Sequence, residues 1–69
     1  MSTQKIDDRF GVTAVKNGFI SREQLFEALK IQLAEDLKGL KHRLIGEILL
    51  VKEYITEVQI DKVIESMSF

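Results

Sequence analysis

The chain has 69 residues, with ten basic and eleven acidic side chains and no cysteine or proline. Its length fits one domain spanning 1–69. The near-even charge argues against a DNA- or RNA-binding protein, which usually carries a basic excess. Without cysteine the chain has no disulfide or thiolate metal site, and its one histidine cannot form a histidine-rich metal site.

The first predicted element is a helix that ends before Gly18. Ile6, Phe10, Ala14 and Val15 recur at the spacing of one helical face. A lysine and an asparagine precede Gly18, which is typical of a helix C-terminus.

A second, longer helix is predicted from Arg22 to Leu37. Ser21 and Gln24 form a capping box, in which the hydroxyl and the amide each bond to the other residue's backbone N–H. The helical face that follows holds Leu25, Ala28, Leu29, Gln32 and Leu33. Gly39 marks the end of the helix, and residues 38–41 are the predicted connection.

Two more helices are predicted in the second half of the chain. Apolar residues suggest a third helix at Leu44, Ile45, Ile48 and Leu49. Thr56 and Gln59 form another capping box before a fourth face of Ile60, Val63, Ile64 and Met67. The alternative is a β-strand over "EILLVKEYI", because isoleucine and valine favour sheets. No nearby segment offers a clear partner strand, so we favour the helices.

The two halves match at an offset of 35 residues. Phe19 pairs with Tyr54, Ser21 with Thr56 and Gln24 with Gln59, while most exposed positions differ. We therefore predict an all-α bundle of two repeated helical hairpins with about four helices, one repeat at about 6–37 and the other at about 41–69.

Gly11 and Gly46 occupy equivalent positions inside helical patterns. A glycine there costs roughly 1 kcal/mol relative to alanine. Close approach of another helix or of a ligand to the backbone would each explain a glycine at these sites. The sequence leaves both explanations open.

The segment "RFGVTAVKNGFISREQLFEALKIQ" resembles the repeated motif of the N-terminal domain of type II secretion and type IV pilus assembly ATPases. That motif reads Arg-Leu-Gly, then a Leu, a Gly, two spaced Leu and a Gln. The first copy matches at Arg9, Gly11, Gly18, Leu25, Leu29 and Gln32, with Phe10 and Ala14 in place of Leu. The second copy keeps Gly46, but it has Arg43 one place early, Glu53 for Gly and Met67 for Gln.

The resemblance implies two functions, because some family members bind the bacterial messenger cyclic di-GMP and others dock the secretion machinery. As a nucleotide receptor, the chain would use Arg9, Phe10, Gly11, Gly18, Leu25, Leu29 and Gln32, with Arg43 and Gly46 from the second copy. A guanidinium group suits both phosphate and guanine.

Because the second copy is incomplete, we expect a non-enzymatic binding module that docks a protein partner, with secretion or pilus machinery as the implied partner. Cyclic di-GMP binding is the alternative, including a homodimer that presents two first copies to one ligand. Docking predicts an exposed apolar patch that includes Phe26, Phe69 or Leu40. Nucleotide binding predicts a basic groove centred on Arg9. A scaffold that dimerises only for stability is the third hypothesis.

No enzyme or cofactor is expected. The ATPase phosphate loop is absent, and the single histidine lacks the spacing of a catalytic set. The longest apolar run, "LIGEILLV", contains Glu47 and is too short to span a bilayer. The first ten residues lack the apolar core of a signal peptide, so we expect a cytoplasmic protein.

Overall fold

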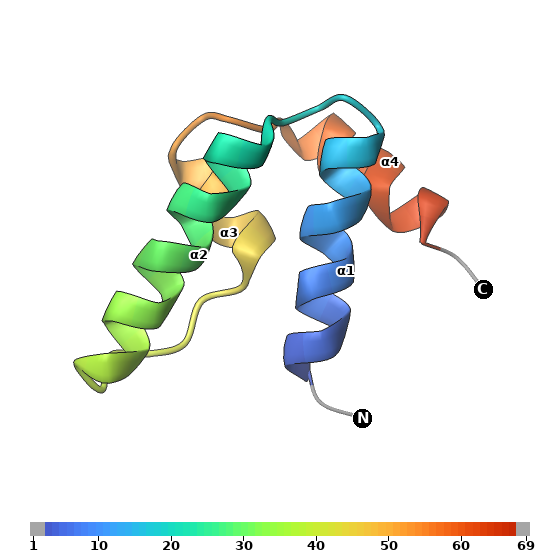
Figure 1. The fold of residues 1–69 in the computed structure, drawn as a ribbon. Helices are drawn as coiled ribbons and strands as arrows, with labels where there is room; N and C mark the ends of the chain where they lie inside the picture. Colours follow the sequence, from blue (N-terminus) through green and yellow to red (C-terminus); the bar gives the residue numbers. More distant parts are fainter. Residues whose placement is uncertain (1–2, 68–69) are drawn as a thin grey trace.

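The computed structural model describes residues 3–67, and all its regular elements there are helices (Figure 1). This confirms the all-α prediction, and the β-strand alternative is wrong because its first residues lie in a helix. The helices are α1 (Thr3–Lys16), α2 (Arg22–Leu37), α3 (Ile45–Val51) and α4 (Glu57–Ser66). The predicted bounds of the second helix are those of α2.

Helix α1 is the centre of the bundle, because it packs against each of the other three helices. Helix α2 also packs against α3, and α4 passes behind the upper part of α1 (Figure 1). The core takes side chains from all four helices, and its largest fully buried members are Ile45, Ile48, Leu49 and Val63. Three of these belong to α3, so the shortest helix is also the most enclosed.

The turn within the α1–α2 hairpin and the turn within the α3–α4 hairpin have the same backbone geometry. In the first, Gly18 has a φ of +79°, and the N–H groups of Gly18 and Phe19 donate to the carbonyls of Val15 and Ala14 at 2.9 and 3.0 Å. In the second, Glu53 has a φ of +63°. There the N–H groups of residues 53 and 54 donate to the carbonyls of residues 50 and 49, both at 3.0 Å. Both are Schellman motifs, which satisfy carbonyls at a helix C-terminus.

Both predicted capping boxes are present. The Ser21 hydroxyl accepts from the Gln24 N–H at 3.1 Å, and the Gln24 side chain accepts from the Ser21 N–H at 2.9 Å. Thr56 and Gln59 repeat this exchange at 3.1 and 3.0 Å. The first turn of each second helix is therefore satisfied locally.

Close packing within the protein explains the two helical glycines. A Cβ atom on Gly11 would lie 2.5 Å from Leu25 Cδ1, and one on Gly46 would lie 3.2 Å from the Phe10 ring. Of the two explanations left open by the sequence, approach of a neighbouring helix accounts for both glycines without a ligand.

Candidate functional site

An open groove of about 410 Å³ lies between α1, α3 and α4. We call it the Leu50 groove. Its lining residues are Ile6, Asp7, Phe10, Leu44, Gly46, Glu47, Leu50, Ile60, Ile64 and Met67. Ile6, Leu44 and Ile64 are exposed although they are apolar, so the protein itself leaves their outer surfaces uncovered.

The groove is lined by apolar residues of α3 and α4 that lie beside the buried residues of each helix but are not themselves buried in the core. In α4, Val63 and Met67 are buried, whereas Ile64 is 55% exposed. In α3, the buried Ile45, Ile48 and Leu49 face inward and leave Leu50 on the groove side. Gly46 has no side chain, so α3 can lie directly against the Phe10 ring.

The charged residues that line the groove are acidic. Glu47 is exposed, and Asp7 is buried. Glu57 and Asp61 precede Ile60 and Ile64 by three residues on α4, and three-residue spacing places side chains on neighbouring parts of a helix surface. Among the described side chains, 5–67, no lysine or arginine lines the groove.

A buried polar cluster holds the α3 wall of the groove in place. The Asp7 carboxylate of α1 accepts from the Ile45 N–H, at 2.9 Å to Oδ1 and 3.0 Å to Oδ2. The side-chain amide of Gln32 donates to Asp7 Oδ2 and to the Arg43 carbonyl, both at 2.8 Å. Leu44 at the helix start has no side-chain acceptor, so Asp7 takes the role of a capping residue from another helix.

Two further contacts stiffen the start of α3. The Glu47 carboxylate accepts from the Leu44 N–H at 2.8 Å. Arg43 makes a two-point contact with Glu35 of α2, Nε to Oε1 at 3.0 Å and Nη2 to Oε2 at 2.6 Å. The Arg43 hydrogen bonds lower the pKa of Glu35 below its ordinary range. The connection before α3 is thus tied to α2 on one side and to α1 on the other.

The structure distributes the sequence-predicted nucleotide residues over several places. Phe10 and Gly46 meet in the Leu50 groove, and Leu25 and Leu29 line a separate hollow with Asp8 between α1 and α2. Leu25 also packs over Gly11.

The remaining predicted residues lie elsewhere. Gln32 is occupied by the buried cluster, and the Arg43 side chain by Glu35. Arg9 is exposed on α1, and Gly18 lies in the first turn.

Two of the three residues proposed for an exposed apolar patch are exposed. Phe26 and Leu40 both lie at the surface, and Phe69 falls outside the described residues. Sequence reasoning missed Ile6, Leu44 and Leu50 as groove residues. The available signal was the run "LIGEILLV", which is apolar on more faces than one packed side of a helix needs.

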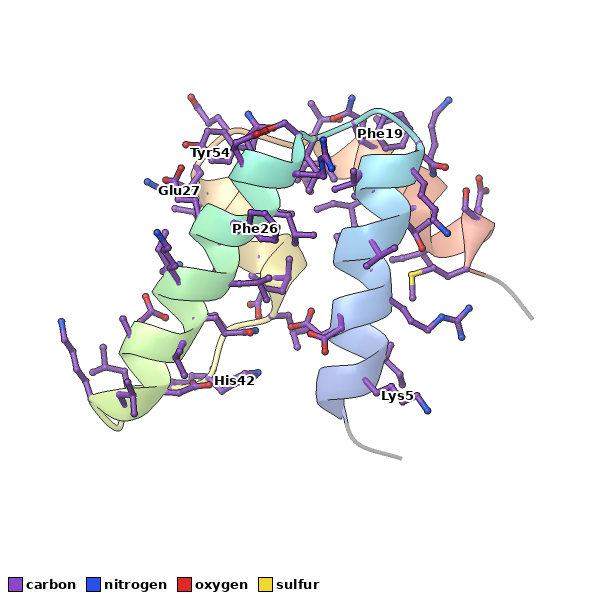
Figure 2. The ribbon with its side chains drawn as sticks, in the orientation of Figure 1. Lys5, Phe19, Phe26, Glu27, His42 and Tyr54 are labelled. Carbon is purple, nitrogen blue, oxygen red and sulfur yellow. The ribbon has the colours of Figure 1, made fainter. Side chains whose placement is uncertain are left out.

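Side chains of the turn between α3 and α4 also bind α2. The Tyr54 hydroxyl donates to Glu27 Oε1 at 2.9 Å, and Lys52 Nζ lies 2.8 Å from Glu27 Oε2. Figure 2 shows Tyr54 and Glu27 side by side at that end of α2. The hydrogen bonds from Lys52 and then Tyr54 lower the pKa of Glu27.

Neither metal-binding nor membrane-spanning features are found in the part of the chain that the structure describes. Residues 3–67 contain no group of three or more potential metal-binding side chains. None of the described helices has the length and apolar character needed to cross a membrane. Comparison of the chain with protein-family models, with curated proteins and with solved structures gives no match in any of the three.

Proposed function

We propose that this protein is a non-enzymatic docking module that receives an amphipathic helix of a partner protein in the Leu50 groove. The observation that carries the proposal is the lining of the groove, which is mostly apolar and whose charged members, Asp7 and Glu47, are both acidic. A component of secretion or pilus machinery is the partner class implied by the sequence resemblance.

The apolar lining of the groove, which α1, α3 and α4 contribute, suits a helix. An amphipathic helix binds such a groove by laying apolar residues at i, i+3, i+4 and i+7 into it. Here Phe10 forms part of the floor, and Ile6, Leu50 and Ile64 are available to contact those residues.

Acidic side chains at the groove and on α4 favour a basic partner. Glu47 lines the groove, and Glu57 and Asp61 are exposed on α4, three residues before Ile60 and Ile64. Complementary potentials across an interface favour the right partner and penalise like charges. The partner helix should therefore carry lysine or arginine beside its apolar face. Among the described residues that line the groove, no basic side chain is present to meet the two phosphates of cyclic di-GMP.

The test is an amide-shift NMR titration of the labelled protein with three probes. The first is a designed 18-residue helical peptide with leucines at i, i+3, i+4 and i+7 flanked by lysines. The second has glutamates in place of the lysines, and the third is cyclic di-GMP. We expect saturable shifts at Gly46, Leu50 and Ile64 with the lysine peptide and weaker shifts with the glutamate peptide.

A different pattern of shifts would contradict the docking proposal. If neither peptide shifts these residues while cyclic di-GMP shifts amides around Arg9, Gly11 and Gln32, the docking proposal is wrong. Nucleotide binding through the first motif copy would then take its place.

A further inference from the structure

Among the described residues, two charged side chains line the Leu50 groove, and they differ in how far a partner can reach them. Asp7 is 5% exposed, and its two carboxylate oxygens accept from the Ile45 N–H at 2.9 and 3.0 Å. Oδ2 also accepts from the Gln32 amide at 2.8 Å. A partner cation could bind Asp7 only by displacing donors that hold the start of α3. Glu47 is exposed, so it is the lining carboxylate that a partner can contact.

The capping role of Glu47 does not require its charge. Glu47 is the third residue of α3, and its Oε1 accepts from the Leu44 N–H at 2.8 Å. Gln24 in α2 and Gln59 in α4 hold the same position and accept from the N–H of their own N-cap residues at 2.9 and 3.0 Å. An amide oxygen is therefore sufficient at this position. The negative charge occurs in the helix whose third residue lines the groove, whereas neither glutamine lines it.

The capping bond also holds the carboxylate of Glu47 in place. An ion pair between exposed side chains usually gains little, because both side chains lose conformational freedom when they meet. Glu47 is already held through Oε1 in the free protein, which reduces the loss of freedom on binding. A carboxylate has two oxygens and about four acceptor sites, so the single capping bond leaves capacity for a partner's cation.

The basic side chains that precede α3 are bound to carboxylates of α2. Arg43 makes its two-point contact with Glu35, at 3.0 and 2.6 Å. His42 Nδ1 lies 3.0 Å from Asp36 Oδ1. These contacts commit both basic side chains to α2 rather than to Glu47.

A second explanation for an acid at this position is the helix dipole, which favours a negative charge near a helix N-terminus. That effect would change the stability of α3 but not the choice between partners of opposite charge. Stability and selectivity measured in the same variant therefore separate the two roles.

We propose that Glu47 determines the specificity of the Leu50 groove by pairing with a lysine or arginine of the partner helix. This inference rests on the docking function proposed above, and it names the residue that recognises the charge of the partner. The apolar lining supplies contact with partners of either charge, and Glu47 decides between them. Ion pairs at exposed sites change affinity by up to about fivefold, so the expected effect is about two- to fivefold.

Calorimetry with the lysine-flanked and glutamate-flanked peptides tests this assignment. Glu47→Gln removes the charge and keeps an acceptor for the Leu44 N–H, as in the two glutamine-capped helices. We expect it to bind the lysine peptide about two- to fivefold more weakly than the unchanged protein does, and the glutamate peptide no more weakly. Glu23→Gln is the matched control, because Glu23 is an exposed acid in the first turn of α2 and does not line the groove. It should leave both affinities unchanged, and urea unfolding reports any effect on stability.

Replacing the peptide lysines by glutamine, one at a time, tests the same ion pair without altering the protein. One of these lysines should contribute about two- to fivefold to binding of the unchanged protein and nothing to binding of Glu47→Gln. The assignment is overturned if Glu47→Gln keeps the full preference for the lysine peptide, or if no single lysine is coupled to Glu47. If the unchanged protein binds neither peptide, the docking function itself is wrong and the assignment is wrong with it.

Discussion

The α1–α2 and α3–α4 hairpins have the same turn and the same cap, yet they are fastened in different ways. Each first helix ends in a Schellman motif, and each second helix starts with a capping box. Helix α1 has 14 residues and reaches past its own hairpin to contact α3 and α4. Helix α3 has seven and depends on neighbours for its first turn.

The clearest difference is at the equivalent positions Gln32 and Met67, both of which are buried. Gln32 donates to Asp7 and to the Arg43 carbonyl, and so joins the first hairpin to the start of the second. Met67 makes apolar contacts instead, because it packs in the core beside the Leu50 groove. The copies thus keep the features that shape a hairpin and diverge where their neighbours differ.

The largest expected effect comes from removing the carboxylate that joins the hairpins. Asp7→Ala leaves the Ile45 N–H and one Gln32 N–H without their acceptor, so we expect a loss of about 2–3 kcal/mol in the free energy of unfolding. Urea unfolding measures this loss. Asp61→Ala, at an exposed site on α4, is the control and should change stability by less than about 0.5 kcal/mol. Equal effects at the two sites would contradict the role given to Asp7.

Exchanging the residue that distinguishes the hairpins gives the next largest effect. Gln32→Met keeps a similar size but removes the donor to Asp7 and to the Arg43 carbonyl, so we expect a cost of about 1–3 kcal/mol. In an Asp7→Ala background the same change should cost much less, because the two side chains form one cluster. Strictly additive free energies in a double-mutant cycle would show that they act independently.

A smaller effect is expected at the turns. Glu53 has the left-handed backbone that costs a residue with a Cβ atom about 1 kcal/mol or more, so Glu53→Gly should stabilise the protein by up to about 1 kcal/mol. Gly18→Ala should destabilise it by about 1 kcal/mol through the backbone alone, because no atom lies within 4 Å of the added Cβ. Thermal unfolding measures both changes. The same sign for both substitutions would refute the equivalence of the turns.

The smallest effect concerns His42 and Asp36. The hydrogen bond to Asp36, with Nδ1 to Oδ1 at 3.0 Å, raises the pKa of His42 above 6.5. A raised pKa in the folded state stabilises the fold below the ordinary pKa, and this stabilisation is lost as pH rises through the folded pKa. NMR titration of the imidazole should give a pKa above 6.5 that falls in Asp36→Asn. An unchanged pKa in that variant would remove the proposed cause.

The sequence predicted those parts of the fold that depend on local chemistry. The bounds of α2, the two capping boxes and the stop at Gly18 follow from residues only a few positions apart. Glu53 differs from the motif glycine, yet the turn around it keeps the same hydrogen bonds. The residues around this turn therefore form the same Schellman motif even though Glu53 has an unfavourable backbone conformation for a residue with a Cβ atom.

The groove and the polar cluster could not be predicted in the same way, because both depend on how distant helices meet. Asp7 shares a helical face with Phe10 and Ala14, and an acid inside an apolar face was the available signal for a buried role. Gln32 gave the same signal in α2. The hydrogen bonds of Asp7 with the Ile45 N–H and of Gln32 with the Arg43 carbonyl are set by tertiary packing.

The most direct test of the docking account is the affinity of the lysine-flanked helical peptide, measured by calorimetry against three proteins. Leu50→Asp places a charge in the wall of the groove, whereas Val58→Asp places one on an exposed site outside it. We expect Leu50→Asp to bind at least tenfold more weakly than the unchanged protein, which corresponds to about 1.4 kcal/mol, and Val58→Asp to bind equally well. Equal affinity for all three proteins would contradict docking in the Leu50 groove.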